Sequence, residues 1–200
     1  MVHAVGEGTL EATNPVPCAY VQMQLIEGST LRVWAETQPD AAPILDRLLE
    51  AGRALSHAHA QGLLHRDFKP ENVMVRGTAD NPEAVKVMDF GIAAGVLGQE
   101  NESEESKRLT APGVRLGTPH YMAPEQANAA EQSVDERTDV YGMGATLYEL
   151  LSQRRPFEGE TIIELLDAIR EQSPNPLRSV RPGLSRDVEA VCRKAMQHEP

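Results

Sequence analysis

The sequence predicts an α+β fold in which a few strands come first and a helical layer follows. Apolar residues alternate around Val2–Val5 and from Cys18 to Ile26, which is typical of strands. Beyond Pro124 the apolar residues recur at helical spacing. A length of 200 residues corresponds to one large domain or two small ones.

The composition of the chain argues against several classes of function. With 30 acidic and 19 basic residues the net charge is -11, which argues against nucleic-acid binding. No apolar run reaches membrane-spanning length and no signal-type segment opens the chain, so we expect no membrane contact within this segment and a cytoplasmic location. Cys18 and Cys192 lie far apart and predict neither a disulfide framework nor a zinc site.

Capping residues and apolar spacing place the remaining elements. Ser29 or Thr30 is expected to cap a short helix, and a second strand is expected at Val85–Met88. The longer helices are predicted at 43–61, 140–151, 161–170 and 185–196.

Three motifs follow one another in the middle of the chain. They are HRDFKPEN at 65–72, DFG at 89–91 and GTPHYMAPE at 117–125. At about 5% usage per residue type, seven specified residues match by chance on the order of once in 10⁹ positions. In order and spacing the motifs resemble those of protein kinases, and the Lys-Pro-Glu filling resembles the serine/threonine branch. Downstream, 139–144 and 154–157 look like segments of bacterial eukaryotic-type kinases.

The resemblance runs from about residue 18 to the C-terminus and implies a protein-kinase-like fold. It implies that residues 1–26 are a remnant of the small N-lobe (strands 4–5) with the hinge. Residues 27–200 would form the C-lobe, with the catalytic loop, the activation segment and the helical layer.

The same resemblance implies the chemical roles. Asp67 would accept the proton of a substrate hydroxyl, and Lys69 would reach the transferred phosphate. Asn72 and Asp89 would bind Mg²⁺ and thereby ATP. An isolated Asp in a loop is more often a turn residue, but three ordered motifs favour the functional interpretation. His65 is implied to be a packing residue near Phe90.

A nucleotide pocket is implied upstream. Met23 would guard its rear, the backbones of Gln24 and Ile26 would bind the adenine edge, and Met74 would form its floor. A strand of this composition could equally well line the hydrophobic core without contacting a ligand.

Regulation is implied by Arg66, because kinases with arginine before the catalytic aspartate commonly bind a phosphate on the activation segment. Thr110 is the expected phosphorylation site. For Ser103 and Ser106 the expected role is solvation of an acidic, mobile loop over 99–107. Thr118 is expected to contact the catalytic loop.

Two features depart from the family pattern. The glycine-rich lid fails at Glu11, and the first lysine is Lys69, so residues 1–68 hold no phosphate-pairing lysine. We therefore expect a fragment, incomplete at both ends and inactive alone. The alternative is a kinase-like lobe that serves as a non-catalytic protein-binding scaffold. A small-molecule phosphotransferase is a third option, against which Lys69–Glu71 and Ala123–Glu125 argue, since those segments serve peptide substrates.

Overall fold

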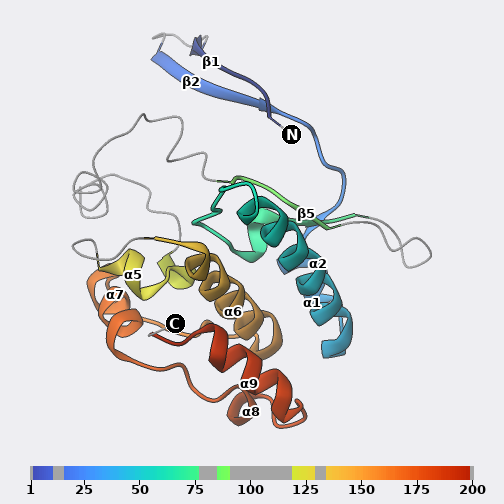
Figure 1. Ribbon diagram of the computed structural model, residues 1–200, viewed down its shortest axis with the longest axis vertical. Coiled ribbons are helices and arrows are strands. Elements are labelled where there is room, and N and C mark those ends of the chain that lie inside the picture. The colour runs from blue at the N-terminus through green and yellow to red at the C-terminus, as the bar shows by residue number, and fades with distance from the viewer. Residues whose placement is uncertain (1, 11–15, 77–84, 91–118, 129–133, 199–200) are drawn as a thin grey trace.

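The computed structural model describes residues 2–10, 16–76, 85–90, 119–128 and 134–198. Within these residues three strands come first, two short strands follow the first two helices, and the remaining helices come last (Figure 1). The strands are β1 (Val2–Leu10), β2 (Val16–Met23), β3 (Ser29–Thr30), β4 (Val73–Val75) and β5 (Val85–Val87). The helices are α1 (Leu31–Glu36), α2 (Ala41–His59), α5 (Pro124–Ala127), α6 (Glu136–Ser152), α7 (Ile162–Glu171), α8 (Leu177–Val180) and α9 (Arg186–Ala195). Two 3-10 turns are η1 (Pro70–Asn72) and η2 (Pro119–Tyr121).

The N-terminal strands form an antiparallel hairpin, drawn beyond the helices in Figure 1. The predicted strand to Ile26 ends earlier, at Met23, because Val2↔Met23 is the last pair in the register of the two strands. Strand β1 runs on to Leu10 instead of stopping near Val5, since β2 pairs with it along its length.

A second sheet is antiparallel and has the strand order β3-β4-β5. Strand β4 directly follows the HRDFKPEN segment, and β5 lies just before the DFG segment. Its first strand follows Gly28, whose φ of 147° favours glycine. A Cβ at Gly28 would lie 2.4 Å from the carbonyl oxygen of Val75, so only glycine fits this close approach. Packing as well as conformation therefore requires glycine at this position.

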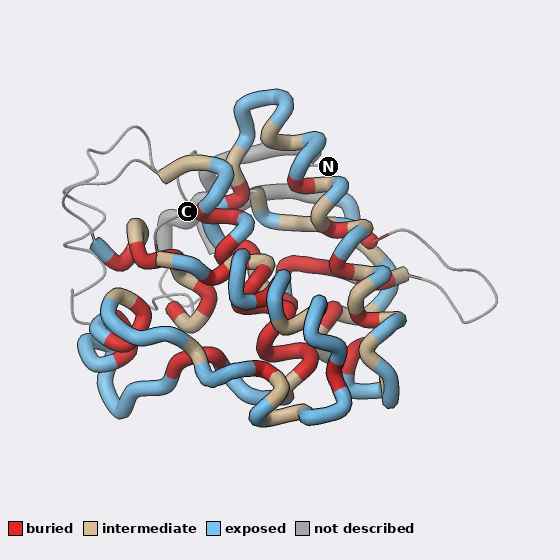
Figure 2. Tube along the Cα trace, turned by 60° about the horizontal axis from the view of Figure 1, so that its bottom comes forward, coloured by how far each residue is buried: buried red, intermediate tan, exposed pale blue. Residues whose placement is uncertain are grey.

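Helix α6 is the centre of the core and contacts α1, α2, α8, α9 and η2. Most of its residues are buried, and Figure 2 shows the buried parts of the trace gathered in the interior. The contact with α9 is close, since a Cβ on Gly144 would lie 2.8 Å from Ala195 Cβ and Met196 Cγ. Any larger residue at 144 would push the two helices apart.

The predicted helices are confirmed with small changes at their ends. Thr30 caps α1, and its Oγ1 accepts a hydrogen bond from Val33 N at 3.4 Å. Helix α6 begins four residues before the predicted Val140, because Asp135 caps it. The short α5 and α8 were not predicted, since four residues are too few for a periodic pattern. None of the helices in the described ranges is long and apolar enough to cross a bilayer.

Candidate active site

The first residues of the HRDFKPEN segment are held by a carboxylate of the core. Asp139 in α6 is 1% exposed, and it accepts hydrogen bonds from the backbone nitrogens of His65 at 2.8 Å and Arg66 at 2.7 Å. Arg66 has a positive φ of 66°, uncommon for a residue with a side chain. The buried carboxylate therefore fixes an unusual turn immediately before Asp67.

His59 completes the bonding of Asp139, with its Nε2 atom 2.6 Å from Asp139 Oδ2. Sequence spacing assigns His59 no functional role. One sequence feature could have indicated that Asp139 has polar partners, because an aspartate on a buried stretch of helix requires them. The partner itself lies 80 positions away and spacing cannot identify it.

The ring of His65 packs as the resemblance implied. Its centroid lies 4.8 Å from that of Phe90 and 5.7 Å from that of Phe68. Nδ1 accepts a hydrogen bond from Asp67 N at 3.3 Å, which leaves Nε2–H to donate to the carbonyl of Met88 at 2.8 Å. Burial lowers the pKa of His65, so the ring is neutral and both nitrogens are used in structure.

Two predicted site residues, Lys69 and Asn72, meet at Asp67. Lys69 Nζ contacts Asp67 Oδ2, and Asn72 Nδ2 donates to the backbone oxygen of Asp67 at 2.9 Å and to Oδ2 at 3.3 Å. The Asp67 side chain is 52% exposed although its neighbours hold it. This leaves a positioned carboxylate that a solvent-borne group can reach.

Asp89 is brought to the same place by the backbone. Met88 N donates to Asn72 O at 2.8 Å, so the residue before Asp89 is tied to the residue predicted to share its metal. Asp89 is exposed and has a φ of 60°.

The other predicted residues have mixed outcomes. Met74 lies half-buried in β4 beside Asn72, whereas Gln24 is exposed and Ile26 half-buried after β2. Met23 ends β2. Thr110, with Ser103, Ser106, Thr118 and the acidic loop over 99–107, lies outside the described residues.

Arg66 links the loop to the segment that follows residue 118. Its carbonyl accepts a hydrogen bond from Gln126 Nε2 at 2.7 Å, while Gln126 Oε1 accepts from Ala123 N at 3.0 Å. The Arg66 side chain is exposed. Gln126, which directly follows the third motif, thus links Ala123 of that motif to Arg66 of the first.

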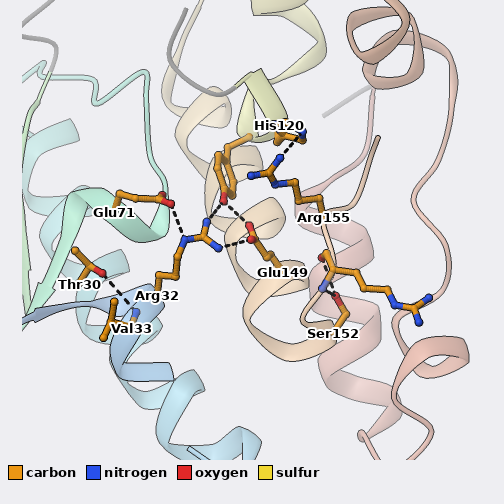
Figure 3. A network of polar contacts seen from close by, with 10 residues as sticks. Thr30, Arg32, Val33, Glu71, His120, Glu149, Ser152 and Arg155 are labelled. Carbon is orange, nitrogen blue, oxygen red and sulfur yellow. Dashed lines mark hydrogen bonds and ion pairs between the residues drawn. The ribbon is translucent and has the colours of Figure 1, made fainter. Parts of the chain in front are cut away.

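A polar network that the sequence did not predict surrounds Arg32 in α1 (Figure 3). Arg32 Nε donates to Glu71 Oε1 at 2.6 Å and NH1 donates to Glu149 Oε1 at 2.5 Å. NH2 donates to the hydroxyl of Tyr121, which in turn donates to Glu149 Oε2. Burial and the bond to Glu149 raise the pKa of Tyr121, so its phenol stays protonated.

Comparison with known proteins agrees with this geometry. The chain matches the family described as "Protein kinase domain" over residues 17–200, and it belongs to that family. It is 36% identical over 195 residues to the serine/threonine-protein kinase PknB of Mycobacterium tuberculosis, an alignment that covers 96% of this chain and 29% of PknB. Against the serine/threonine-protein kinase Pkn1 of Myxococcus xanthus it is 36% identical over 191 residues, covering 96% of this chain and 26% of Pkn1.

A solved structure shares the fold. The crystal structure of Rad53 residues 1-466 in complex with AMP-PNP matches with a TM-score of 0.63 and 26% identity, covering 98% of this chain and 46% of that chain. This chain is therefore a protein kinase domain that is similar in sequence to bacterial serine/threonine kinases, and it spans under a third of the length of either bacterial relative.

Proposed function

We propose that the chain supplies the catalytic region of a protein serine/threonine kinase, which transfers the γ-phosphate of ATP to serine or threonine hydroxyls of protein substrates. The observation that carries the proposal is the convergence of Lys69 and Asn72 on Asp67, together with the backbone bond that ties Asn72 to the residue before Asp89. These are among the groups that phosphoryl transfer requires on the protein side.

Asp67 is the group that takes the proton of the acceptor hydroxyl. Its exposed carboxylate is oriented by Asn72 from within the same loop, which supports a role as general base. Lys69 lies beside it and would stabilise the negative charge of the phosphoryl group. The protein thus positions the reacting groups and neutralises the charge of the phosphates, and it forms no covalent intermediate.

Asn72 and Asp89 would hold Mg²⁺. Within the described residues no three His, Cys, Asp or Glu side chains gather, as a cage made by protein alone would need. Mg²⁺ commonly takes one or two protein oxygens and completes its shell with substrate phosphates and water. Asn72 uses its amide nitrogen on Asp67, which leaves the amide oxygen as the metal ligand. Bound Mg-ATP supplies the phosphoryl group and the charge neutralisation.

The adenine pocket would lie between the segment after β2 and the β4 strand. Met23, Gln24, Ile26 and Met74 retain the roles that the resemblance implies. Met74 pairs with Thr30 across the sheet, which places it between the hinge side and Asn72.

The division of the chain into two lobes bears on the activity of the 200 residues taken alone. We assign residues 1–26 to the remnant of the small lobe and 27–200 to the large lobe. Because residues 1–68 contain no lysine, the phosphate-pairing lysine is missing and this 200-residue chain would bind Mg-ATP weakly and transfer phosphate negligibly. The same absence favours the second candidate, a lobe used as a protein-binding scaffold.

The deciding experiment uses a chimera in which the N-terminal lobe of an active serine/threonine kinase of the family precedes residue 17, hereafter the lobe chimera. We expect it to phosphorylate serine and threonine in a protein substrate, and phosphoamino-acid analysis to find no phosphotyrosine. A folded lobe chimera that binds ATP but transfers nothing would favour the scaffold function.

A further inference from the structure

Strand β5 is the edge of its sheet and leads into Asp89. Its three residues pair on one side with Val73–Val75 of β4. Met88 N, just beyond the strand, donates to Asn72 O on that same side at 2.8 Å. Successive N–H groups of an antiparallel strand point to opposite edges, so the N–H of Val85, three positions earlier, points away from β4. Val85 is buried, and a buried N–H requires an acceptor.

Glu50 in α2 supplies that acceptor. Its Oε2 atom accepts a hydrogen bond from Val85 N at 3.3 Å, and its Oε1 atom accepts from Arg47 Nη1 at 2.7 Å. The guanidinium carbon of Arg47 lies 5.8 Å from the ring centroid of Trp34 in α1. Both oxygens of Glu50 are therefore in use, and the carboxylate is held from α1 and α2 while it binds the outer edge of β5.

We propose that Glu50 is a positioning residue for the metal site: by accepting the outward N–H of Val85 it fixes where β5 lies along β4, and through β5 it fixes Asp89 beside Asn72. Glu50 acts through the strand and contacts neither substrate nor metal. The inference rests on the proposed kinase function for its meaning in catalysis. Its structural content can be tested without phosphoryl transfer.

A short edge strand needs such a second attachment. The pairing with β4 covers three residues, and few ladder bonds specify the register of a strand only weakly. A slip of one residue would move Asp89 by about 3.3 Å. Mg²⁺ accepts ligand oxygens only near about 2.0–2.1 Å, so Asn72 and Asp89 could not share an ion after such a slip.

The proposed role requires an acceptor oxygen at the correct reach, whatever its charge. Alanine at position 50 removes the acceptor, and aspartate keeps the charge on a side chain one methylene shorter. Glutamine keeps both length and acceptor, but its amide N–H₂ would face Arg47. The double variant R47A/E50Q avoids that conflict and leaves the amide oxygen free to accept from Val85 N.

The test is nuclear magnetic resonance of the folded 200-residue chain, with no nucleotide or metal added. In E50A we expect the amide proton signal of Met88 to move upfield, as its hydrogen bond to Asn72 O lengthens. We also expect loss of the cross-peak between the Hα protons of Val73 and Val87, which lie opposite each other in the register. Both signals should keep their normal values in R47A/E50Q.

D46A is the matched control, because it removes an exposed carboxylate from the same helix. Neither signal should change in this variant. An E50A chain that melts at a lower temperature but keeps both signals would show that Glu50 only stabilises the fold, and would overturn the proposal. So would a loss of both signals in R47A/E50Q.

E50D replaces E50A if the alanine variant does not fold, and the same changes are expected of it. Failure of both to fold would assign Glu50 to stability alone and overturn the proposal.

A second measurement uses the lobe chimera. There E50A should raise the half-saturating magnesium concentration about threefold or more, with the rate at saturating magnesium within about twofold of the parent. R47A/E50Q and D46A should leave the magnesium curve unchanged. An unchanged curve in E50A would overturn the positioning role. If no lobe chimera transfers phosphate, the kinase function fails, while the magnetic resonance experiment still decides whether Glu50 fixes β5.

Discussion

The carboxylate of Asp139 accepts a hydrogen bond from the backbone nitrogen of Arg66 at 2.7 Å, across 73 positions of sequence. The same carboxylate accepts from His65 N and pairs with His59. One buried side chain of the central helix therefore holds the backbone directly ahead of Asp67. The position of the proposed base depends on the core of the large lobe.

Asp139→Ala should destabilise the chain strongly. The change leaves His59 and two backbone N–H groups buried without their acceptor, and breaking a buried charge network costs about 3–5 kcal/mol. Urea denaturation followed by circular dichroism measures the loss. Asp167→Ala is the control, because Asp167 pairs with Arg170 at the surface and should cost less than about 1 kcal/mol. Equal losses in the two variants would contradict this account.

The sequence predicted those parts of the fold and site that depend on local pattern. The longer helices follow from apolar spacing and caps, and Asp67, Asn72 and Asp89 follow from motifs of fixed order. Each of these signals is contained in a short window of residues.

Pairs that join distant windows could not be predicted. Arg32 meets Glu149 across 117 positions, and His59 meets Asp139 across 80. Spacing carries no information on such contacts. The end of β2 at Met23 was missed for a related reason, since it depends on where the partner strand runs out.

Stability should fall as the solution becomes acidic. Burial lowers the pKa of both His65 and His120, and for His120 the neighbouring Arg155 lowers it further. His120 Nε2 accepts from Arg155 NH1 at 2.9 Å and must be unprotonated to do so. The unfolded chain therefore binds more protons below about pH 6.5, the ordinary histidine value, and the stabilisation present above that pH is lost on going lower.

Urea denaturation at pH 7.5 and pH 5.5 measures this effect. We expect the free energy of unfolding to be lower at pH 5.5, and the difference between the two pH values to be smaller in His120→Asn. A variant with the full pH dependence of the unchanged chain would show that His120 does not contribute.

Asp89→Asn should raise the magnesium requirement of the lobe chimera. The substitution removes the charged ligand but keeps an oxygen, so Mg²⁺ still binds, more weakly. We expect the half-saturating magnesium concentration to rise about tenfold or more, read from initial rates over a magnesium series. Asp46→Asn, an exposed change on α2, is the control. An unchanged magnesium curve would remove Asp89 from the metal site.

Phosphorylation of Thr110 should activate the lobe chimera. A phosphate there adds about -1.5 to -2 charges and can form charge-assisted hydrogen bonds with the exposed side chain of Arg66. Glutamates at 100, 102, 104 and 105 oppose it, and salt screens both effects over about 8–10 Å. Mass spectrometry should find Thr110 occupied in active protein, and Thr110→Ala should be less active. An unmodified Thr110 together with a fully active variant would exclude this mechanism.

Replacement of Asp67 by asparagine in the lobe chimera tests the central claim most directly. Asparagine keeps the size of the side chain but cannot accept the hydroxyl proton, so turnover should fall by about 10²–10⁴ with an unchanged melting temperature. The readout is the single-turnover rate of phosphate transfer to a serine peptide, with Asp46→Asn as the matched exposed control. A D67N rate within about twofold of the parent would contradict the role of Asp67 as the base.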